Sequence, residues 1–139
     1  MSIERIAAIA TSLVVVASIV GGLMAVDSPD ERRKERADER RESDLTSLAW
    51  AIDTYWEQQG RLPDRLDDLM QPGLLPKMRV DPLTNTLYEY AAERERYRLC
   101  AVFAMKTKSN VPAGTWDHPA GRHCFKLAPK RRGMAYPGR

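Results

Sequence analysis

The feature that most constrains this chain is an uncharged stretch close to its N-terminus. Residues 6–26 read IAAIATSLVVVASIVGGLMAV, 21 positions without a charged side chain. At about 1.5 Å per residue, a helix of this length crosses a hydrocarbon core of about 30 Å. A removable signal peptide is the alternative, but its best cleavage position, after Ala25, has the bulky Leu23 where a small residue is preferred. The sequence therefore predicts an uncleaved single-pass transmembrane anchor over residues 1–27.

Charge is nearly balanced over the whole chain but uneven along it. The 22 Lys and Arg residues and the 19 Asp and Glu residues leave a net charge of only +3, which carries no nucleic-acid-binding signature. Residues 28–44 mix both signs densely, and we interpret them as a charged helical stalk with a solvated surface. Residues 126–139 carry five basic and no acidic side chains. Their Pro and Gly content predicts an extended tail over 129–139 that suits an acidic partner or anionic lipid.

A second helix is expected directly after the span. Ser28 and Glu31 match a capping box, and Pro29 occupies the favoured first helical position. Gly60 is a typical C-terminal stop, which gives a helix of about 30 residues. From residue 45 onward, apolar side chains recur at helical spacing and form one packing stripe, which consists of Leu45, Leu48, Ala49, Ile52, Tyr55 and Trp56.

The C-terminal half is typical of a small sheet. Residues 61–86 contain four prolines and predict an ordered loop with one short helical pattern. Aromatic and β-branched residues then predict strands at 86–91, 96–104 and 122–128, with a short hairpin between the first two. We expect an α+β head over residues 45–128, in which the long amphipathic helix packs on a three-stranded antiparallel sheet. Its predicted core comprises Leu48, Ile52, Tyr55, Trp56, Leu99, Val102, Phe103 and Phe125.

Three segments after the membrane helix together resemble a known superfamily. They are TYWEQQGRLPDRLDDL at residues 54–69, DPLTNTLYEY at 81–90 and YRLCAVF at 97–103. Over roughly residues 45–104 this order resembles the type IV pilin and type II secretion pseudopilin superfamily. The resemblance implies a pilin-like head on the exoplasmic side of a membrane. The matching positions are Tyr55, Gly60, Leu62, Pro63, Leu66, Leu69, Asp81, Pro82, Tyr88 and Tyr90.

The N-terminal segment departs from that superfamily. Processed members carry Phe-Thr-Leu-Ile-Glu after a cleavage site, and the glutamate lies inside the apolar stretch, where it sets subunit register in the filament. Here the nearest acid, Glu4, precedes the apolar stretch. We therefore interpret the chain as similar in head shape but not as a processed filament subunit.

Two topological signals in the sequence disagree. Arg5 precedes the span, whereas six basic residues follow it within about 20 positions, and the positive-inside rule alone would keep these in the cytoplasm. The six are Arg32, Arg33, Lys34, Arg36, Arg40 and Arg41. The family resemblance and the placement of the cysteines favour the opposite orientation. We expect a bacterial inner-membrane protein with a cytoplasmic N-terminus and a periplasmic head.

Cysteine and histidine chemistry has one favoured interpretation and two alternatives. Cys100, Cys124, His118 and His123 are of the types that zinc prefers. However, His123 and Cys124 are adjacent in a predicted strand and so point to opposite faces, which does not suit one compact site. A disulfide needs only that Cys100 and Cys124 lie on neighbouring strands in an oxidising compartment. We predict this disulfide, worth about 3.5 kcal/mol, with a zinc-binding or a redox-active head as the alternatives.

The sequence contains no recognisable catalytic signature, Gly-rich phosphate loop or paired-carboxylate setting. We therefore expect a protein that is not an enzyme and has neither a cofactor nor a small-molecule substrate. The predicted function is that of a structural or accessory subunit that braces a multi-subunit membrane complex, either energy-transducing (photosynthetic or respiratory) or part of the envelope machinery. The alternative is a pseudopilin subunit of a type II secretion or type IV pilus-like filament.

Two sets of residues are candidate partner contacts. In the span, Ala17 with Gly21 and Ser18 with Gly22 form small-xxx-small pairs that allow another helix to approach closely. In the head and tail the candidates are Trp116, which suits equally a lid over the sheet, and Lys130, Arg131, Arg132 and Tyr136. The expected partners are integral-membrane subunits and the lipid bilayer, and not nucleic acid.

Overall fold

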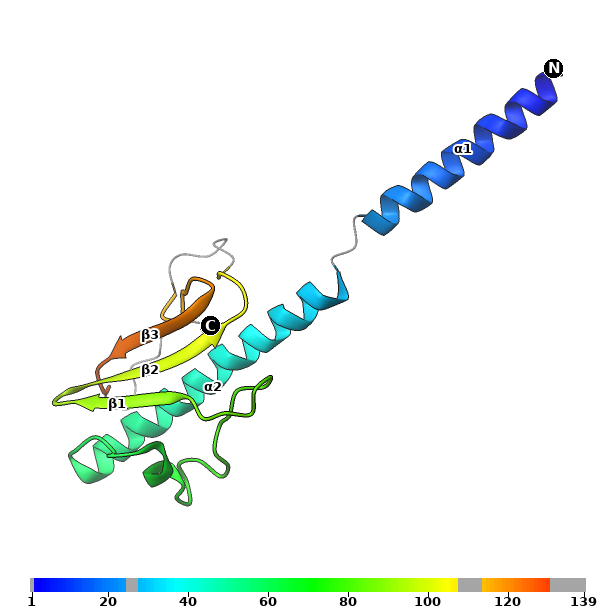
Figure 1. Ribbon diagram of the computed structural model, residues 1–139. Coiled ribbons are helices and arrows are strands. Elements are labelled where there is room, and N and C mark those ends of the chain that lie inside the picture. Colours follow the sequence, from blue (N-terminus) through cyan, green and yellow to red (C-terminus); the bar gives the residue numbers. More distant parts are fainter. Residues whose placement is uncertain (1, 25–27, 108–113, 131–139) are drawn as a thin grey trace. The chain divides into compact units, whose positions relative to one another are not determined.

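The computed structural model describes residues 2–24, 28–107 and 114–130. The chain divides after Arg33 into two units, which are treated separately below. In chain order the elements are α1 (Ile3–Met24), α2 (Pro29–Gln59), the 3-10 helix η1 (Leu66–Leu69), β1 (Glu89–Glu93), β2 (Arg96–Phe103) and β3 (Gly121–Leu127) (Figure 1). The fold class is α+β, as predicted.

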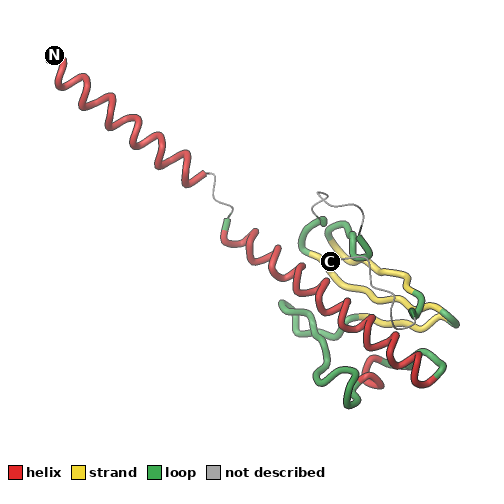
Figure 2. The backbone as a smooth tube through the Cα atoms, turned by 180° about the vertical axis from the view of Figure 1, so that it is seen from behind, coloured by secondary structure: helices red, strands yellow, loops and turns green. Residues whose placement is uncertain are grey.

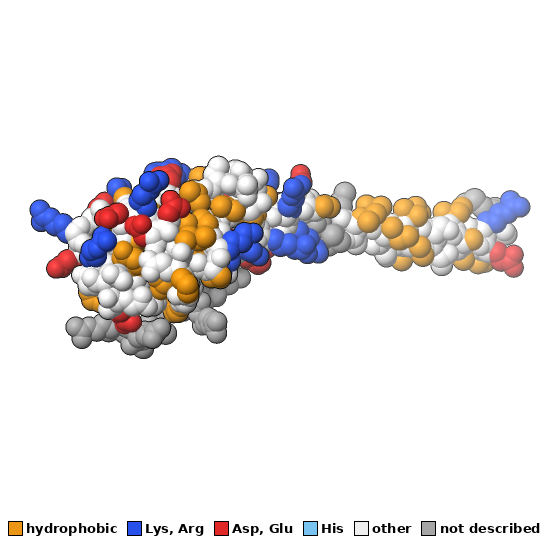
Figure 3. Space-filling model, turned by 90° about the horizontal axis from the view of Figure 1, so that it is seen from below, with side chains coloured by type: hydrophobic (Ala, Val, Ile, Leu, Met, Phe, Trp, Pro, Cys, Tyr) orange, Lys and Arg blue, Asp and Glu red, His pale blue; other side chains and the backbone are white. Residues whose placement is uncertain are grey.

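After Glu4 and Arg5 in its first turn, the first helix, α1, carries no charged side chain on any side. Its side chains from Ile3 to Leu23 are exposed in the isolated chain, and Figure 3 shows apolar side chains along this helix. Within the described residues it is the one helix that is long and apolar enough to cross a membrane. A helix that is hydrophobic on every side needs an apolar environment on every side, which a lipid bilayer supplies.

The bounds of α2 follow from its capping residues. Ser28 Oγ accepts a hydrogen bond from the Glu31 N–H at 3.3 Å, and Pro29 is the first helical residue, where its missing N–H is not needed. At the other end, Gly60 has a φ of 68°, and its N–H donates to Trp56 O at 2.8 Å. A positive φ of this kind is typical of a glycine that ends a helix. The predicted helix is therefore confirmed at both ends.

The three strands form one antiparallel sheet in the order β1-β2-β3. A turn at Arg94 and Glu95 joins β1 to β2, with Arg94 at a φ of 51°. β2 and β3 pair so that Cys100 lies opposite Cys124. Figures 1 and 2 show the sheet along one side of α2 and the loop between α2 and β1 along another side. The long helix therefore forms the centre of the head.

The first strand begins at Glu89, later than the sequence predicted, because Asp81 closes a turn ahead of it. Asp81 Oδ1 accepts hydrogen bonds from the N–H groups of Leu83 and Thr84 at 2.9 and 3.0 Å. The Asp81 N–H in turn donates to Thr86 O at 2.9 Å. An aspartate that bonds backbone groups two and three positions ahead favours a turn over an extended strand.

The hydrophobic core lies between α2 and the inner face of the sheet. Alternate residues of β2 are buried, because successive side chains of a strand point to opposite faces. Trp56 packs against the buried cluster but is only partly buried. The other predicted core residues that belong to the cluster are Leu48, Ile52, Tyr55, Leu99, Phe103 and Phe125.

The prediction that Val102 belongs to the core is wrong. Val102 is 56% exposed, whereas Ala101 and Phe103 on either side of it are buried. The period of two along β2 therefore places Val102 on the outer face of the sheet, together with Cys100. The apolar, β-branched side chain of Val102 favours a strand, but this side-chain type does not indicate which face of the sheet the residue lies on.

The second half of the charged segment belongs to the head. Ala37, Asp38, Arg41 and Asp44 of α2 are buried, so the prediction of a solvated stalk is wrong for these four residues. The side chains of Asp38 and Arg41 lie on the same stripe as the apolar residues that follow. The packed part of the helix thus starts before Leu45, where the sequence had placed the beginning of the head.

The two faces of β2 predict different responses to truncation. Leu99→Ala leaves a cavity in the core and should lower the free energy of unfolding by about 2–5 kcal/mol. Val102→Ala, on the exposed face of the same strand, should lower it by less than about 1 kcal/mol. Urea unfolding of the full chain in detergent, followed by tryptophan fluorescence, measures both values. Equal losses would contradict the assignment of the two faces.

Candidate functional site

Arg41 is a buried cation at the centre of an ion-pair cluster with Asp38 and Asp81, here called the Arg41 cluster. Its side chain is 4% exposed. Nε and Nη2 donate to the two carboxylate oxygens of Asp81 at 2.5 and 3.0 Å, and Nη1 donates to Asp38 Oδ1 at 2.7 Å. Asp38 lies one turn earlier in α2, whereas Asp81 belongs to the loop before β1. The cluster therefore joins the helix to that loop.

Asp38 also holds the chain where it leaves β2. Its Oδ1 accepts a hydrogen bond from the Ala104 N–H at 2.9 Å, and its Oδ2 accepts one from the Met105 N–H at 2.8 Å. Three segments that are distant in sequence thus meet at the Arg41 cluster. A buried charge costs several kcal/mol unless it is paired and hydrogen-bonded, a condition that the two carboxylates and the guanidinium satisfy together.

Opposing effects set the protonation of the Arg41 cluster. Burial raises the pKa of the Asp81 carboxyl, but hydrogen bonds from Arg41 and from the Thr84 and Leu83 N–H groups lower it more, to about 2. Burial lowers the pKa of the Arg41 guanidinium, and the hydrogen bonds to Asp81 and Asp38 outweigh this, so that the pKa lies above its ordinary value. Both groups therefore stay charged at neutral pH.

Two tyrosine hydroxyls add further connections within the head. Tyr88 donates to Asp44 Oδ2 on α2 at 3.1 Å, and Tyr90 donates to Pro63 O at 2.8 Å. Burial raises the pKa of both phenols, and the nearby Asp44 carboxylate raises that of Tyr88 further. Both hydroxyls therefore keep their protons and act as donors at neutral pH. These contacts give a structural role to two residues of the pilin-like sequence pattern.

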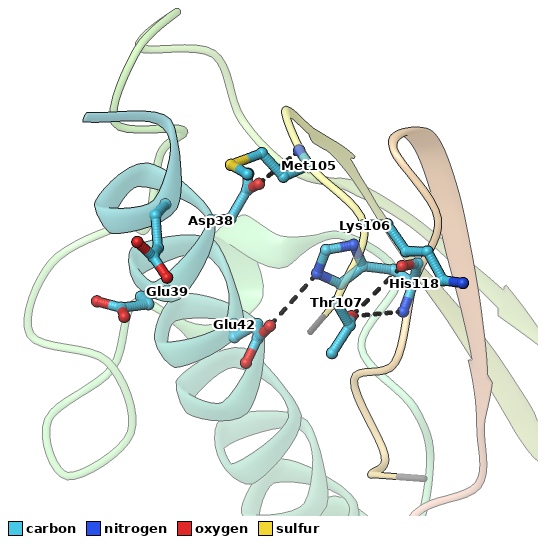
Figure 4. Close-up of a pocket in the computed structure, with 8 residues that line it drawn as sticks. Asp38, Glu39, Glu42, Met105, Lys106, Thr107 and His118 are labelled. Carbon is cyan, nitrogen blue, oxygen red and sulfur yellow. Dashed lines mark hydrogen bonds and ion pairs between the residues drawn. The ribbon is translucent and has the colours of Figure 1, made fainter. Parts of the chain in front are cut away.

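A cleft of about 160 Å³ lies between α2 and the chain that follows β2 (Figure 4). One wall comes from the helix and carries only acidic side chains, and the other carries a lysine, a threonine, a methionine and a histidine. We call it the His118 cleft. Its lining residues are Glu35, Asp38, Glu39, Glu42, Met105, Lys106, Thr107 and His118.

His118 is buried at this cleft, as is Asp38, and its ring has contacts on both sides. Nε2 is 3.3 Å from Glu42 Oε1, toward which it points in Figure 4, and Nδ1 is 3.1 Å from Pro119 O. The ring stacks on Phe103 with a centroid distance of 3.4 Å. Thr107 holds the backbone of His118, because its Oγ1 accepts from the His118 N–H at 2.9 Å and its N–H donates to His118 O at 3.0 Å. The imidazole is therefore fixed between helix and sheet.

The chemistry available in the His118 cleft is that of hydrogen-bond acceptors and fixed charge. The acidic wall suits cationic or hydrogen-bond-donating groups. The Thr107 hydroxyl is already engaged by the backbone of His118. Among the residues that the structure describes, no three His, Cys, Asp or Glu side chains come close enough together to hold a metal ion.

Cys100 and Cys124 form a disulfide between directly opposed positions of β2 and β3, with their Cα atoms 4.0 Å apart. The bond lies on the outer face of the sheet. His123 instead lies opposite Ala101 on the inner face, and its ring centroid is 4.8 Å from that of Phe125. The predicted disulfide is therefore confirmed, and the two neighbours, His123 and Cys124, serve opposite faces.

The predicted partner contacts in the head are only partly accessible. Trp116 is 7% exposed, and its ring lies edge-on to Phe125 at 4.9 Å, so it acts as a lid over the sheet rather than as an exposed anchor. Lys130 is partly buried, and its backbone N–H donates to Asp53 Oδ1 at 3.1 Å. The remaining candidates lie outside the described residues: Arg131, Arg132 and Tyr136.

The small residues of the span are exposed on α1. Ala17, Ser18, Gly21 and Gly22 are exposed in the isolated chain, and a Cβ added at either glycine would meet nothing within 4 Å. The Ser18 hydroxyl donates to Val14 O at 2.8 Å and so is satisfied within its own helix. Contact between this small-residue face and another helix remains a prediction.

Comparison of the chain with protein-family models, curated proteins and solved structures gives no match. The pilin-like interpretation therefore depends on the sequence segments quoted above and on the order of the structural elements.

Sequence reasoning missed the Arg41 cluster, although a signal for it exists. Asp38, Arg41, Leu45 and Leu48 follow one another at intervals of three, four and three residues. This spacing continues the apolar stripe of α2 toward its N-terminus. Opposite charges at stripe positions indicate a buried ion pair, whereas the dense charge of the segment as a whole had indicated a solvated surface.

The Arg41 cluster predicts a loss of stability in acid. Since the pKa of Asp81 lies at about 2 in the folded head, below its ordinary value of 3.8, its ion pair is fully stabilising above about pH 4 and is lost as the pH falls toward 2. The expected contribution is about 2 kcal/mol. Asp81→Asn should lower the free energy of unfolding at pH 7 and flatten this part of the pH profile. Urea unfolding between pH 7 and 2 measures both effects.

Asp64→Asn is the matched control. Asp64 pairs with Arg61, and both side chains are largely exposed, so its removal should change the free energy of unfolding by less than about 1 kcal/mol. A pH profile for Asp81→Asn that coincides with the Asp64→Asn profile would show that the cluster does not contribute as described.

Proposed function

We propose that this protein is a non-catalytic accessory subunit, anchored by α1 in a bacterial inner membrane, with a periplasmic head that braces a larger membrane complex. The observation that carries the proposal is the presence in one chain of an apolar helix and a head cross-linked by the Cys100–Cys124 disulfide. Disulfides persist in oxidising compartments and are rare in the cytosol. The disulfide therefore supports an exoplasmic head.

Two of the six basic residues after the span make ion pairs in the folded head. Arg41 is required by the buried cluster, and Arg40 Nε lies 3.8 Å from Asp44 Oδ1. Both arginines thus make contacts in the folded head, and these contacts do not depend on the side of the membrane that the head occupies. This weakens the argument that these charges were selected to keep the segment in the cytoplasm.

A structural rather than catalytic role is supported by how the head uses its reactive side chains. Cys100 and Cys124 are bonded to each other. His118 is stacked on Phe103 and bonded to Glu42. Among the described residues, groups bonded or stacked in this way do not form the arrangement of a nucleophile, a base and an orienting residue.

The order of elements supports a pilin-like head. A long helix is followed by a loop and a three-stranded antiparallel sheet, and Tyr88 and Tyr90 bond to α2 and to the loop. In the proposed role, the anchor packs against integral-membrane subunits and the head supplies a rigid contact surface. The parent complex is energy-transducing (photosynthetic or respiratory) or part of the envelope machinery.

The second candidate is a pseudopilin of a type II secretion or type IV pilus-like filament, because the same order of helix and sheet favours it. The two candidates differ at the N-terminus. A processed N-terminus in the intact mass of the purified protein would support the pseudopilin, and an intact Met1 would support the accessory subunit.

Purification in a mild detergent tests the proposed function. The protein should co-purify with integral-membrane subunits in constant proportion, as identified by quantitative mass spectrometry. Gly22→Leu should reduce this yield severalfold, because a larger side chain at a small-xxx-small position prevents close helix approach, while the site itself is open in this chain. Val16→Leu, which the helical repeat places on the opposite side of α1, is the matched control. Purification as a lone monomer would refute the proposal.

A further inference from the structure

The disulfide lies on the face of the sheet that does not carry the core. Cys100 shares this outer face with the exposed Val102. Cys124 is partly exposed and belongs to β3, an edge strand with which no further described strand pairs. The bond between them is therefore close to solvent on the side of Cys124.

An ion pair crosses the other end of the disulfide. Arg122 of β3 donates from Nε and Nη2 to the two carboxylate oxygens of Glu89 in β1, at 2.9 and 2.5 Å. Glu89 lies opposite Cys100, and Arg122 lies opposite Val102, so the pair reaches from β3 over β2 to β1. We call it the Arg122–Glu89 strap. The strap lies beside Cys100, which is only 5% exposed.

The strap makes the two sulfur atoms chemically unequal. A thiolate that opens a disulfide approaches along the S–S axis, on the side away from the sulfur that leaves. The approach to Cys100 comes from the side of β1, where Glu89 and the guanidinium lie. The approach to Cys124 comes from the edge of β3 with which no described strand pairs, where Lys126 on the same face is exposed and attracts an anion.

The strap also favours Cys100 as the leaving sulfur. Arg122 Nη2 lies 3.9 Å from Cys100 Sγ. A nearby cation stabilises a thiolate, and a more stable thiolate leaves a disulfide faster. Steric access and charge therefore favour the same direction of opening.

We propose that the Cys100–Cys124 bond is a thiol–disulfide exchange site of fixed polarity, which an external thiol opens at Cys124 with Cys100 as the leaving group. The attacking thiolate sulfur bonds to Cys124 Sγ, the S–S bond breaks, and its electron pair goes to Cys100 Sγ, beside Arg122. A second thiol then attacks the external sulfur of the mixed disulfide and releases the Cys124 thiolate. The head gains two electrons and two protons, and the two external thiols become one disulfide.

The head should remain folded when this bond opens. The β2–β3 ladder runs from Tyr97 to Phe103 on one strand, and the buried cluster lies on the opposite face of the sheet from the disulfide. Reduction removes a cross-link but neither the backbone ladder nor the core. The bond is thus suited to reversible opening, in contrast to a disulfide buried within a core.

A monothiol trap tests the polarity in the oxidised full chain in detergent. The protein is exposed briefly to reduced glutathione, free thiols are blocked with N-ethylmaleimide, and tryptic peptides are analysed without reduction. The two cysteines fall in separate peptides, residues 99–106 and 123–126. We expect glutathione on Cys124 and maleimide on Cys100, with a preference of about tenfold over the reverse pattern. Equal labelling, or glutathione mainly on Cys100, would overturn the proposal.

Two arginine variants test whether the Arg122–Glu89 strap causes the preference for attack at Cys124. Arg122→Gln should reduce the preference to near equality. The variant removes the ion pair that hinders the approach to Cys100, and it removes the cation that stabilises the Cys100 thiolate. Arg61→Gln, which breaks the exposed ion pair with Asp64 in the loop after α2, should leave the preference unchanged. An unchanged preference in Arg122→Gln refutes the role of the strap.

After complete reduction of the wild type, tryptophan fluorescence should still report a folded head, and unfolding at this step would contradict a reversible site.

Discussion

The arrangement of the head depends on the buried charge of Arg41. A guanidinium removed from water must be paired and hydrogen-bonded, and Asp38 and Asp81 together meet this condition. Because Asp81 also closes the turn before β1 and Asp38 also binds the chain leaving β2, one charge determines where three segments meet. An apolar residue at this position would pack, but it would not select these partners. We infer that the cluster specifies the position of the loops on α2 more than it adds to stability.

The two faces of the sheet have different roles. The inner face packs on α2 through alternate residues of β2 and through Phe125. The outer face carries the disulfide and the exposed Arg122–Glu89 and Arg98–Glu93 ion pairs. In the proposed exchange, the covalent change takes place on the outer face, and the core lies on the opposite face. The proposed accessory subunit would in this way combine a rigid head with a redox-sensitive surface.

Local signals in the sequence were sufficient for much of this fold. The uncharged run predicted α1, Ser28 and Gly60 predicted the ends of α2, and the adjacency of His123 and Cys124 in a strand predicted that they serve opposite faces. Two features were not accessible in this way. The face on which Val102 lies depends on which alternate residues of β2 point to the core. The apolar side chain of Val102 does not indicate this by itself. The burial of Arg41 depends on its ion pair with Asp81, 40 positions later in the sequence. Only the helical spacing from Asp38 to Leu48 indicated that Arg41 is buried. The His118 cleft likewise depends on a contact between Glu42 and His118 that is made only in the folded chain.

The central claim is that an apolar anchor holds an oxidised head outside the cytoplasm. The most direct measurement is the redox state of Cys100 and Cys124 in intact cells, trapped by rapid acid quenching and followed by alkylation of free thiols with a mass-tagged maleimide. The account predicts that neither cysteine is tagged unless the sample is first reduced, after which both are. Tagging of both cysteines in most of the protein without prior reduction would show that the head is not kept oxidised and would contradict the account.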